Sequence, residues 1–285
     1  MNSLTAGRSG PARATRRDLD TARGRIALLE APGNRRPVLM VPGYTGSKED
    51  FGVILEPLAA AGYRTVAMDQ RGQYESPGPD DEAAYTVAEL GRDVLAVLAD
   101  FSRPAHLLGH SFGGLVARSA VLADPGAVAS LVLLDSGPAA IGGSREERMR
   151  ALEPMLAAGG MPAVYAAMEQ LATGDPKWVA SEPEMKAFLK RRFLASSPTA
   201  LRAMGDALRN EPDLVADLRE TGIPVLVAYG EHDDAWAPAV QAEMARRLGA
   251  RHAVIPDSVH APAAENPAET IRVLTDFWSA VDTAR

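Results

Sequence analysis

One pentapeptide combines a hydroxyl nucleophile with the small residues that a sharp turn requires. Gly109-His110-Ser111-Phe112-Gly113 follows an apolar run and precedes a helical pattern. A serine hydroxyl is a weak nucleophile until it is oriented and paired with a base. A tight turn from a strand into a helix lifts the serine above the sheet, and only small flanking residues permit that bend. We therefore predict that Ser111 attacks a carbonyl carbon.

Two further residue types would complete this chemistry: an imidazole that takes the serine proton, and a carboxylate that orients the imidazole. The imidazoles in the sequence are His106, His110, His232, His252 and His260. The candidate aspartates are Asp135, at the end of an earlier strand, and the neighbours Asp233 and Asp234, after a later one. The alternative to a catalytic role for Ser111 is a glycine-rich turn that serves packing, in which the serine takes no part in chemistry. A phosphate loop is excluded, because the sequence lacks a Gly-x-x-x-x-Gly-Lys-Ser/Thr pattern.

The elements around these residues alternate between short apolar runs and longer amphipathic patterns. This rhythm is typical of a mostly parallel sheet flanked by helices, which is an α/β fold. Strands are expected at residues 25–30, 38–41, 64–68, 105–108, 131–134, 223–229 and 252–255. Helices are expected after Ser47, after Thr86, from Phe112 to Asp124, and after Asn266. Ser111 then stands where a strand passes into a helix.

The alternation of strands and helices stops in the middle of the chain, where helical patterns continue without a convincing strand. Prolines cut this stretch into short helices; they are Pro154, Pro162, Pro176, Pro183, Pro198 and Pro212. We predict a helical cap inserted at 137–222 in a core formed by 18–136 and 223–285. Residues 1–17 are basic and predicted to be a disordered tail, since Asp18-Leu19-Asp20 follows where a signal peptide would need an apolar run.

Five short segments carry a family resemblance in their order and spacing. They are Val41-Pro42-Gly43-Tyr44, Asp69-Gln70-Arg71-Gly72, Gly109-His110-Ser111-Phe112-Gly113-Gly114, Gly230-Glu231-His232-Asp233 and Val259-His260. From about Arg25 to its C-terminus, the chain resembles the α/β-hydrolase family. It departs from many relatives at Pro42-Gly43, where they carry His-Gly. It departs again at Gln73-Tyr74-Glu75, where they carry a second glycine. Both departures are expected to affect the entrance of the pocket.

The resemblance implies roles for the base and the acid. The family's order along the chain is serine, acid, histidine, with the histidine in a loop after the final strand, and His260 fits that place. Family spacing from Gly230 selects Asp233 as the acid. Asp234 remains a rival because it adjoins Asp233. Asp135 is a third candidate, since some relatives place the acid after an earlier strand.

The resemblance also implies which groups stabilise the negative charge that develops on the carbonyl oxygen of the substrate. The backbone N–H groups of Tyr44 and Phe112 are expected to form an oxyanion hole. This chemistry requires neither a metal nor an organic cofactor. The paired aspartates Asp233 and Asp234 are a poor metal site, because the sequence shows no cluster of further ligands around them.

Composition limits the partners and the compartment. The chain has 285 residues, no cysteine and a formal charge of -7. It therefore has no thiol nucleophile or disulfide, which fits a reducing compartment, and we expect a cytoplasmic protein. Its acidity argues against nucleic acid or an anionic membrane as the main partner. No run approaches the roughly 20 apolar residues of a membrane span. The oligomeric state is left open.

These observations favour a serine hydrolase that cleaves a carboxylic ester or lactone of a small, largely apolar substrate through an acyl-enzyme. Aromatic and methionine side chains of the predicted cap favour an apolar acyl or alcohol group. The cap arginines Arg145, Arg148, Arg191 and Arg192 are predicted to be a solvated face rather than a carboxylate site. Alternatives on the same fold are carbon–carbon bond hydrolysis, aminopeptidase action and cofactor-free perhydrolysis. A ligand-binding protein with an inactive triad is the non-enzymatic alternative.

Overall fold

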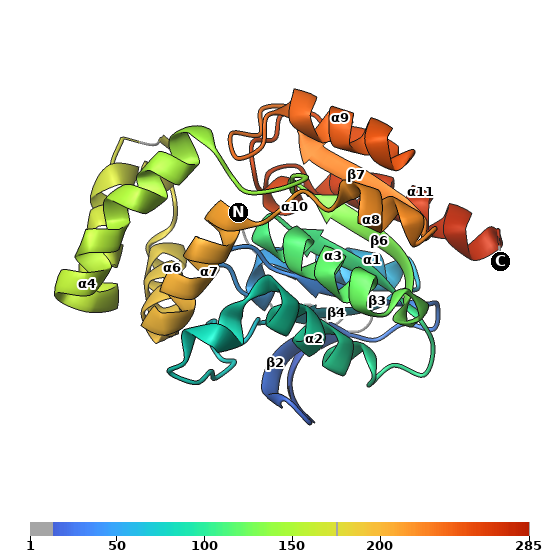
Figure 1. Cartoon of the computed structure of the whole chain (residues 1–285), viewed down its shortest axis with the longest axis horizontal. Coiled ribbons are helices and arrows are strands. Elements are labelled where there is room, and N and C mark those ends of the chain that lie inside the picture. The colour runs from blue at the N-terminus through green and yellow to red at the C-terminus, as the bar shows by residue number, and fades with distance from the viewer. Residues whose placement is uncertain (1–13, 175, 285) are drawn as a thin grey trace.

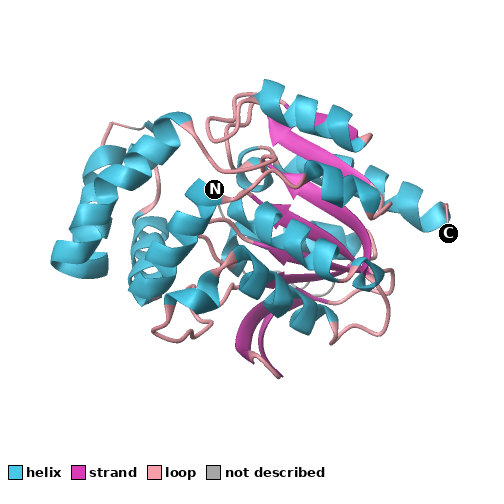
Figure 2. Cartoon of the chain, in the orientation of Figure 1, coloured by secondary structure: helices cyan, strands magenta, loops and turns pink. Residues whose placement is uncertain are grey.

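An eight-stranded sheet forms the centre of the protein, which is described by a computed structural model over residues 14–284 except 175 (Figures 1 and 2). The strands are β1 (Thr15–Thr21), β2 (Gly24–Ala31), β3 (Pro37–Val41), β4 (Arg64–Met68), β5 (Ala105–His110), β6 (Val128–Leu134), β7 (Val225–Gly230) and β8 (Arg251–Ile255). Their order across the sheet is β1-β2-β4-β3-β5-β6-β7-β8. β1, β2 and β4 pair antiparallel, and all other neighbours are parallel. The predicted mostly parallel α/β sheet is confirmed.

Helices cover both faces of the sheet. The helices α2 (Val87–Leu98), α3 (Phe112–Ala123), α8 (Val215–Glu220) and α9 (Pro238–Leu248) bury apolar side chains in one core. The helices α1 (Gly52–Ala60) and α11 (Pro267–Thr283) pack in a second core on the other face. Parallel strands buried on both faces read as continuous apolar runs, which explains why most strand positions were predictable.

Two predicted helix starts are capped by side chains. The Thr86 hydroxyl accepts a hydrogen bond from the backbone N–H of Glu89 at 3.2 Å, and α2 begins at Val87. The Asn266 side chain accepts a bond from the N–H of Glu269 at 3.3 Å, and α11 begins with Pro267. Each cap satisfies an N–H group that has no partner within the first turn of its helix.

The predicted tail extends too far, because its last residues form the start of β1. β1 pairs with β2 along its whole length through a tight turn at Gly24, whose φ is +121°. The Arg17 guanidinium binds Glu30 at 3.0 Å and Asp100 at 2.7 Å. Two of the basic residues that suggested a solvated tail, Arg16 and Arg17, therefore pair with carboxylates of the described chain. The rest of the predicted tail, residues 1–13, lies outside the described residues.

The stretch predicted as a cap is helical, and most of it stands to one side of the sheet (Figure 1). Its helices are α4 (Gly143–Ala172), α5 (Pro176–Val179), α6 (Pro183–Ala195) and α7 (Pro198–Asn210), followed by α8 in the core layer. α4 bends at Gly160, where φ is +65°. A small apolar cluster joins α4, α6 and α7 around Tyr165, Phe193 and Leu201. Within the described chain, no helix is both long enough and apolar enough to cross a bilayer.

Candidate active site

Ser111 occupies a strained turn between β5 and α3. Its φ of 54° and ψ of -124° lie outside the regions that L-residues favour. A Cβ atom on Gly109 would lie 2.2 Å from the carbonyl oxygen of Gly113. A Cβ on Gly113 would lie 2.3 Å from the carbonyl oxygen of Val41. Backbone cannot yield to such contacts, so the turn that raises Ser111 above the sheet depends on both glycines.

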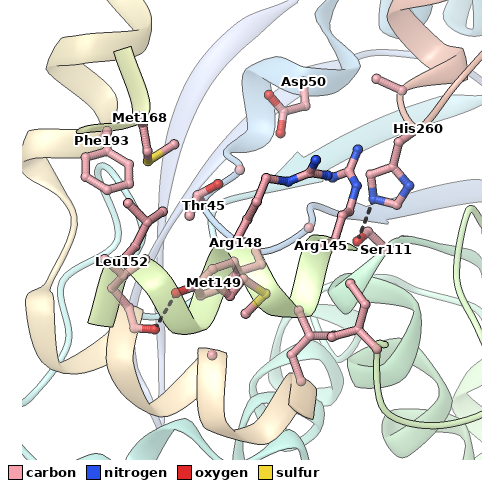
Figure 3. A pocket seen from close by; sticks show the side chains of 18 of the residues that line it. Thr45, Asp50, Ser111, Arg145, Arg148, Met149, Leu152, Met168, Phe193 and His260 are labelled. Carbon is pink, nitrogen blue, oxygen red and sulfur yellow. Dashed lines mark hydrogen bonds between the residues drawn. The ribbon is translucent and has the colours of Figure 1, made fainter. Parts of the chain in front are cut away.

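The serine, the loop histidine and one aspartate form a continuous hydrogen-bonded line. Ser111 Oγ lies 3.0 Å from His260 Nε2 (Figure 3), and His260 Nδ1 lies 2.8 Å from Asp233 Oδ1. The carboxylate accepts a hydrogen from Nδ1, which leaves the lone pair of Nε2 facing the serine hydroxyl. The structure therefore brings together the three side chains that the sequence selected.

Asp233 is held by donors that occupy both of its oxygens. Oδ1 also accepts the backbone N–H of Ala235 at 2.9 Å, and Oδ2 accepts Gln241 Nε2 at 2.6 Å. The amide of Gln241 donates to the carbonyl of Trp236 at 2.8 Å as well, and this side chain is fully buried. Sequence reasoning missed Gln241, because nothing in its position on α9 indicates that it faces the loop after β7.

Asp234 turns away from the histidine toward the cap. Its carboxylate binds the guanidinium of Arg145 at 2.6 Å and that of Arg148 at 3.2 Å. Partial burial acts to raise the pKa of Asp234, but the hydrogen bond and charge of Arg145 outweigh it and the pKa is lowered. The side chain is 40% exposed. Of the two adjacent aspartates, Asp233 alone is hydrogen-bonded to His260 in the described structure.

Asp135 lies at the end of β6 with φ of 46°, fully buried behind the triad acid. Its Oδ1 accepts the backbone N–H of Gly230 at 2.8 Å, and its Oδ2 has no partner within the described residues. Burial raises the pKa of Asp135 well above its usual range, and the charge of Asp233 raises it further. Both effects disfavour the charged form of this carboxyl group relative to an exposed aspartate.

Asp135, Asp233 and His260 are also the residues that could hold a cation. One ligand atom from each lies within 4.8 Å of the others. A cation bound to Nδ1 would replace the hydrogen that His260 shares with Asp233, so it would break the line that reaches Ser111. Asp135, Asp233 and His260 therefore fit a metal poorly as long as His260 is hydrogen-bonded to both Asp233 and Ser111.

The His260 loop is fixed by two side chains that the sequence did not single out for this purpose. Glu265 Oε2 accepts the backbone N–H groups of Val259 at 2.8 Å and Ala261 at 3.0 Å. His110 Nε2 donates to the carbonyl oxygen of His260 at 2.7 Å. His110 thus faces the histidine loop instead of the neighbouring serine hydroxyl, and it holds the backbone of the predicted base.

His110 predicts a loss of stability in mild acid. Burial, and then the neighbouring His260 ring, lower the pKa of His110 from 6.5 to about 4. Because the unfolded chain takes up this proton first, the contribution is complete above pH 6.5 and is lost as the pH falls toward 4. Residual solvent contact of the ring reduces the effect. Between pH 7 and pH 5, we expect about 1–2 kcal/mol less unfolding free energy from this residue.

Urea unfolding at the two pH values tests this expectation. His110→Gln keeps a side-chain donor for the carbonyl of His260 but does not titrate. The wild type should lose about 1–2 kcal/mol more than this variant on going from pH 7 to pH 5. Equal losses in the two proteins would contradict a buried, neutral imidazole at position 110.

The two residues predicted to supply the oxyanion hole, Tyr44 and Phe112, belong to segments that lie next to Ser111. Phe112 is the first residue of α3, and Gly43, which precedes Tyr44, packs against Ser111: a Cβ on Gly43 would lie 3.1 Å from the Cβ of Ser111. Within the described chain, neither the Tyr44 N–H nor the Phe112 N–H has a hydrogen-bond partner. The N-terminus of α3 adds its positive dipole end. The oxyanion hole formed by these two N–H groups stays a prediction.

Side chains of the loop after β4 hold the loop that carries Tyr44. Gln70 Nε2 donates to the carbonyl of Pro42 at 2.8 Å, and Gln73 Nε2 donates to that of Gly43 at 2.9 Å. The buried ammonium of Lys48 binds Glu75 at 2.6 Å. The segment Gln73-Tyr74-Glu75, which departs from many relatives, therefore braces this loop.

Comparison with known proteins identifies the family of this chain. The model of the alpha/beta hydrolase family matches residues 38–273. The chain belongs to this family. It is 30% identical over 237 residues to a pimeloyl-[acyl-carrier protein] methyl ester esterase of Aeromonas hydrophila, a match that covers 78% of this chain and 87% of the relative.

Two further comparisons place the chain among alpha/beta hydrolases. A protein named RutD from Variovorax paradoxus is 39% identical over 109 residues, which span 38% of this chain and 41% of that protein. The solved structure of a thermophilic esterase from Thermogutta terrifontis superimposes with a TM-score of 0.76 at 22% identity, covering 94% of this chain and 99% of that one. At that identity, the likeness shows the shared fold.

In this alpha/beta hydrolase, a cleft of about 880 Å³ lies between the core and the cap and reaches Ser111 and His260. Its wall is mostly apolar. Cap and loop side chains that supply this wall are Ile141, Met149, Leu152, Leu156, Val164, Met168, Phe193, Leu201 and Leu208. Figure 3 shows Met149, Leu152, Met168 and Phe193 extending away from the serine. Such a wall accommodates an apolar group that continues from the reacting carbonyl.

Proposed function

We propose that this alpha/beta hydrolase is a serine esterase that cleaves a carboxylic ester or lactone through an acyl-enzyme. The observation that carries the proposal is the unbroken line from Ser111 Oγ through His260 to Asp233, at the floor of a largely apolar cleft. The nucleophile is within hydrogen-bond reach of its base, and the base is within reach of the group that orients it, which is the arrangement that nucleophilic catalysis needs.

The reaction begins when Ser111 Oγ bonds to the carbonyl carbon of the ester and transfers its proton to His260 Nε2. The carbonyl electrons move to the oxygen, which the N–H groups of Tyr44 and Phe112 stabilise. When the carbonyl re-forms, the bond to the leaving alcohol breaks and His260 gives that alcohol its proton. Water then attacks the acyl-enzyme by the same steps, with His260 as base and then acid, and releases the carboxylic acid and Ser111.

Asp233 acts through the imidazole rather than on the substrate. Its carboxylate fixes the tautomer in which Nε2 accepts the serine proton, and its negative charge stabilises the imidazolium that forms. Ala235 and Gln241 donate to the same carboxylate and thereby fix its position. These bonds keep the acid aligned with His260 throughout the reaction.

The names of similar proteins agree with action on esters. The Aeromonas hydrophila relative is named as a methyl ester esterase, and the Thermogutta terrifontis neighbour is described as an esterase. The mostly apolar wall of the cleft favours a substrate with an apolar acyl or alcohol portion. The ligand-binding alternative is disfavoured by the alignment of all three triad groups, since a protein that only binds would have no use for that alignment.

Covalent labelling tests the proposal without knowledge of the substrate. A fluorophosphonate reacts with a serine that a histidine activates, because phosphorus accepts the nucleophile in place of the carbonyl carbon. We expect mass spectrometry to find one label per chain, on Ser111, and heat-unfolded protein to take up none. An intact folded protein that reacts no faster than free serine would instead support a binding protein with an inactive triad.

A further inference from the structure

The cleft contains charged side chains in an otherwise apolar wall, and their pairing is uneven. Among the described residues, five arginines line the cleft: Arg145, Arg148, Arg192, Arg202 and Arg209. The last three each bind carboxylates that they do not share with another arginine of the cleft. Those pairs are Arg192 with Asp50, Arg202 with Glu82, and Arg209 with Glu153 and Asp206.

Arg145 and Arg148 differ from the others because both bind the single carboxylate of Asp234. Two guanidinium groups and one carboxylate leave one unit of positive charge. The Arg148 side chain is 52% exposed and uses one nitrogen of its guanidinium for Asp234. A guanidinium offers five N–H donors, so each of these arginines retains donors for another acceptor.

The position of this charge relates it to the reacting groups. Figure 3 shows both guanidinium groups reaching into the cleft beside His260 and Ser111, with Met168 and Phe193 beyond them. Asp234, the carboxylate that both arginines bind, is close enough to His260 for the charge of the imidazole to help lower the pKa of Asp234. A substrate bound with its carbonyl at Ser111 therefore brings its neighbouring atoms to these arginines.

We propose that Arg145 and Arg148 bind a carboxylate of the substrate, so that the preferred ester carries a free carboxylate close to the scissile bond. Guanidinium groups bind carboxylates in a bidentate geometry with charge-assisted hydrogen bonds. Within the ion pairs of these two arginines with Asp234, the excess of one positive charge matches a monoanion. Because the chain as a whole carries a formal charge of -7, the positive spot is a local feature. This inference rests on the proposed esterase function and assigns its substrate class.

Asp234 has a defined part in this proposal. In the free protein, its carboxylate binds the guanidinium groups of Arg145 and Arg148 and cancels one of their two positive charges. A substrate carboxylate binds the remaining donors and competes with Asp234 for the rest. Arginine and aspartate variants should therefore change the preference for anionic esters in opposite directions. If the ion pairs between Asp234 and the two arginines only held the cap against the core, the arginine and aspartate variants would change the preference for anionic esters in the same direction.

Matched esters measure this preference. We compare p-nitrophenyl monoesters of dicarboxylic acids of increasing chain length with the corresponding esters whose far carboxylate is a primary amide. The quantity of interest is the ratio of kcat/KM for the anionic ester to that for the neutral ester, after subtraction of spontaneous hydrolysis. Because both esters meet the same triad, changes in folding or in the triad cancel in this ratio.

The wild type should prefer the anionic ester at one or more chain lengths. In the Arg145→Gln/Arg148→Gln double variant, the ratio should fall about ten-fold or more, which is the size of one charge-assisted hydrogen bond. In Asp234→Asn, the ratio should rise. Arg150→Gln is the control, because Arg150 lies on the same helix and pairs with Glu146 but does not line the cleft, and it should leave the ratio unchanged.

Two results overturn the carboxylate site: a wild-type ratio at or below one for every chain length, or a ratio that the double variant leaves unchanged. A shift in the same direction in the double variant and in Asp234→Asn also overturns it and assigns the ion pairs to fastening the cap. Hydrolysis of the neutral esters separates the two proposals. If those esters are cleaved while the ratio fails these tests, the esterase function stands; if no ester is cleaved, the esterase function fails.

Discussion

Replacing Ser111 with alanine is expected to reduce the turnover of an activated p-nitrophenyl ester by a factor of about 10⁴ or more. The variant lacks the oxygen that bonds to the carbonyl carbon, so no acyl-enzyme forms. What remains is the contribution of binding and of the two N–H groups at Tyr44 and Phe112, with water as the attacking group. Steady-state kinetics gives kcat, and a burst of p-nitrophenol in the wild type that is absent in the variant identifies the acylation step.

Ser136→Ala is the matched control for this measurement. Ser136 is a fully buried serine beside the same helix, since a Cβ on Gly114 would lie 2.3 Å from its hydroxyl oxygen. That oxygen has no hydrogen-bond partner within the described residues. Turnover in Ser136→Ala should stay within a few-fold of the wild type. Turnover that survives in Ser111→Ala would remove the nucleophile from the proposed mechanism.

The turn that carries the proposed nucleophile, Ser111, could be predicted from the sequence because its geometry is encoded locally. An apolar run, two glycines around a serine and a helical pattern occupy consecutive positions, and the strained φ of 54° follows from that order. The parallel sheet could be predicted for the same reason, since each buried strand is a short continuous apolar run. β1 was missed because its residues are mostly polar or charged and form ion pairs at the edge of the sheet.

The remaining groups around the site depend on contacts between distant segments, which no local pattern records. Asp233 and Asp234 are adjacent and chemically identical, and the turn after β7 decides which one faces His260. Gln241 and Glu265 reach the site from separate helices, and each acts on a neighbouring loop through a hydrogen bond. A glutamine or glutamate on a helix has no sequence signal that distinguishes such a role from an exposed position.

The arginines of the cap illustrate the same limit for the substrate. Arg145 and Arg148 were predicted to form a solvated face, since charged residues in a helical pattern usually do. In the structure both line the cleft, because the start of α4 lies opposite the loop that carries Asp234. The identity of a substrate group therefore depends on how the inserted helices are placed over the core, which their sequence alone does not specify.

The assignment of the acid leads to the second large effect. Asp233→Asn should lower kcat on the same ester by a factor on the order of 10³–10⁴. Asparagine removes the negative charge that stabilises the imidazolium. It also places an amide donor against either His260 Nδ1 or the donating amide of Gln241. Facing Nδ1, it favours the tautomer whose Nε2 carries a hydrogen and cannot accept the serine proton. Facing Gln241, it forces that side chain to rotate and lose its bond to Trp236.

Asp135→Asn is the comparison that decides between the two buried aspartates. Burial and the charge of Asp233 raise the pKa of Asp135, and within the described chain its carboxylate is not hydrogen-bonded to His260. The side-chain carbonyl of asparagine can still accept the N–H of Gly230. We expect kcat within about ten-fold of the wild type, since the bond to Gly230 is kept and the bond between His260 and Asp233 is not touched. If the order of the two effects were reversed, Asp135 would be the acid that supports His260, and the bond between His260 and Asp233 would have only a structural role.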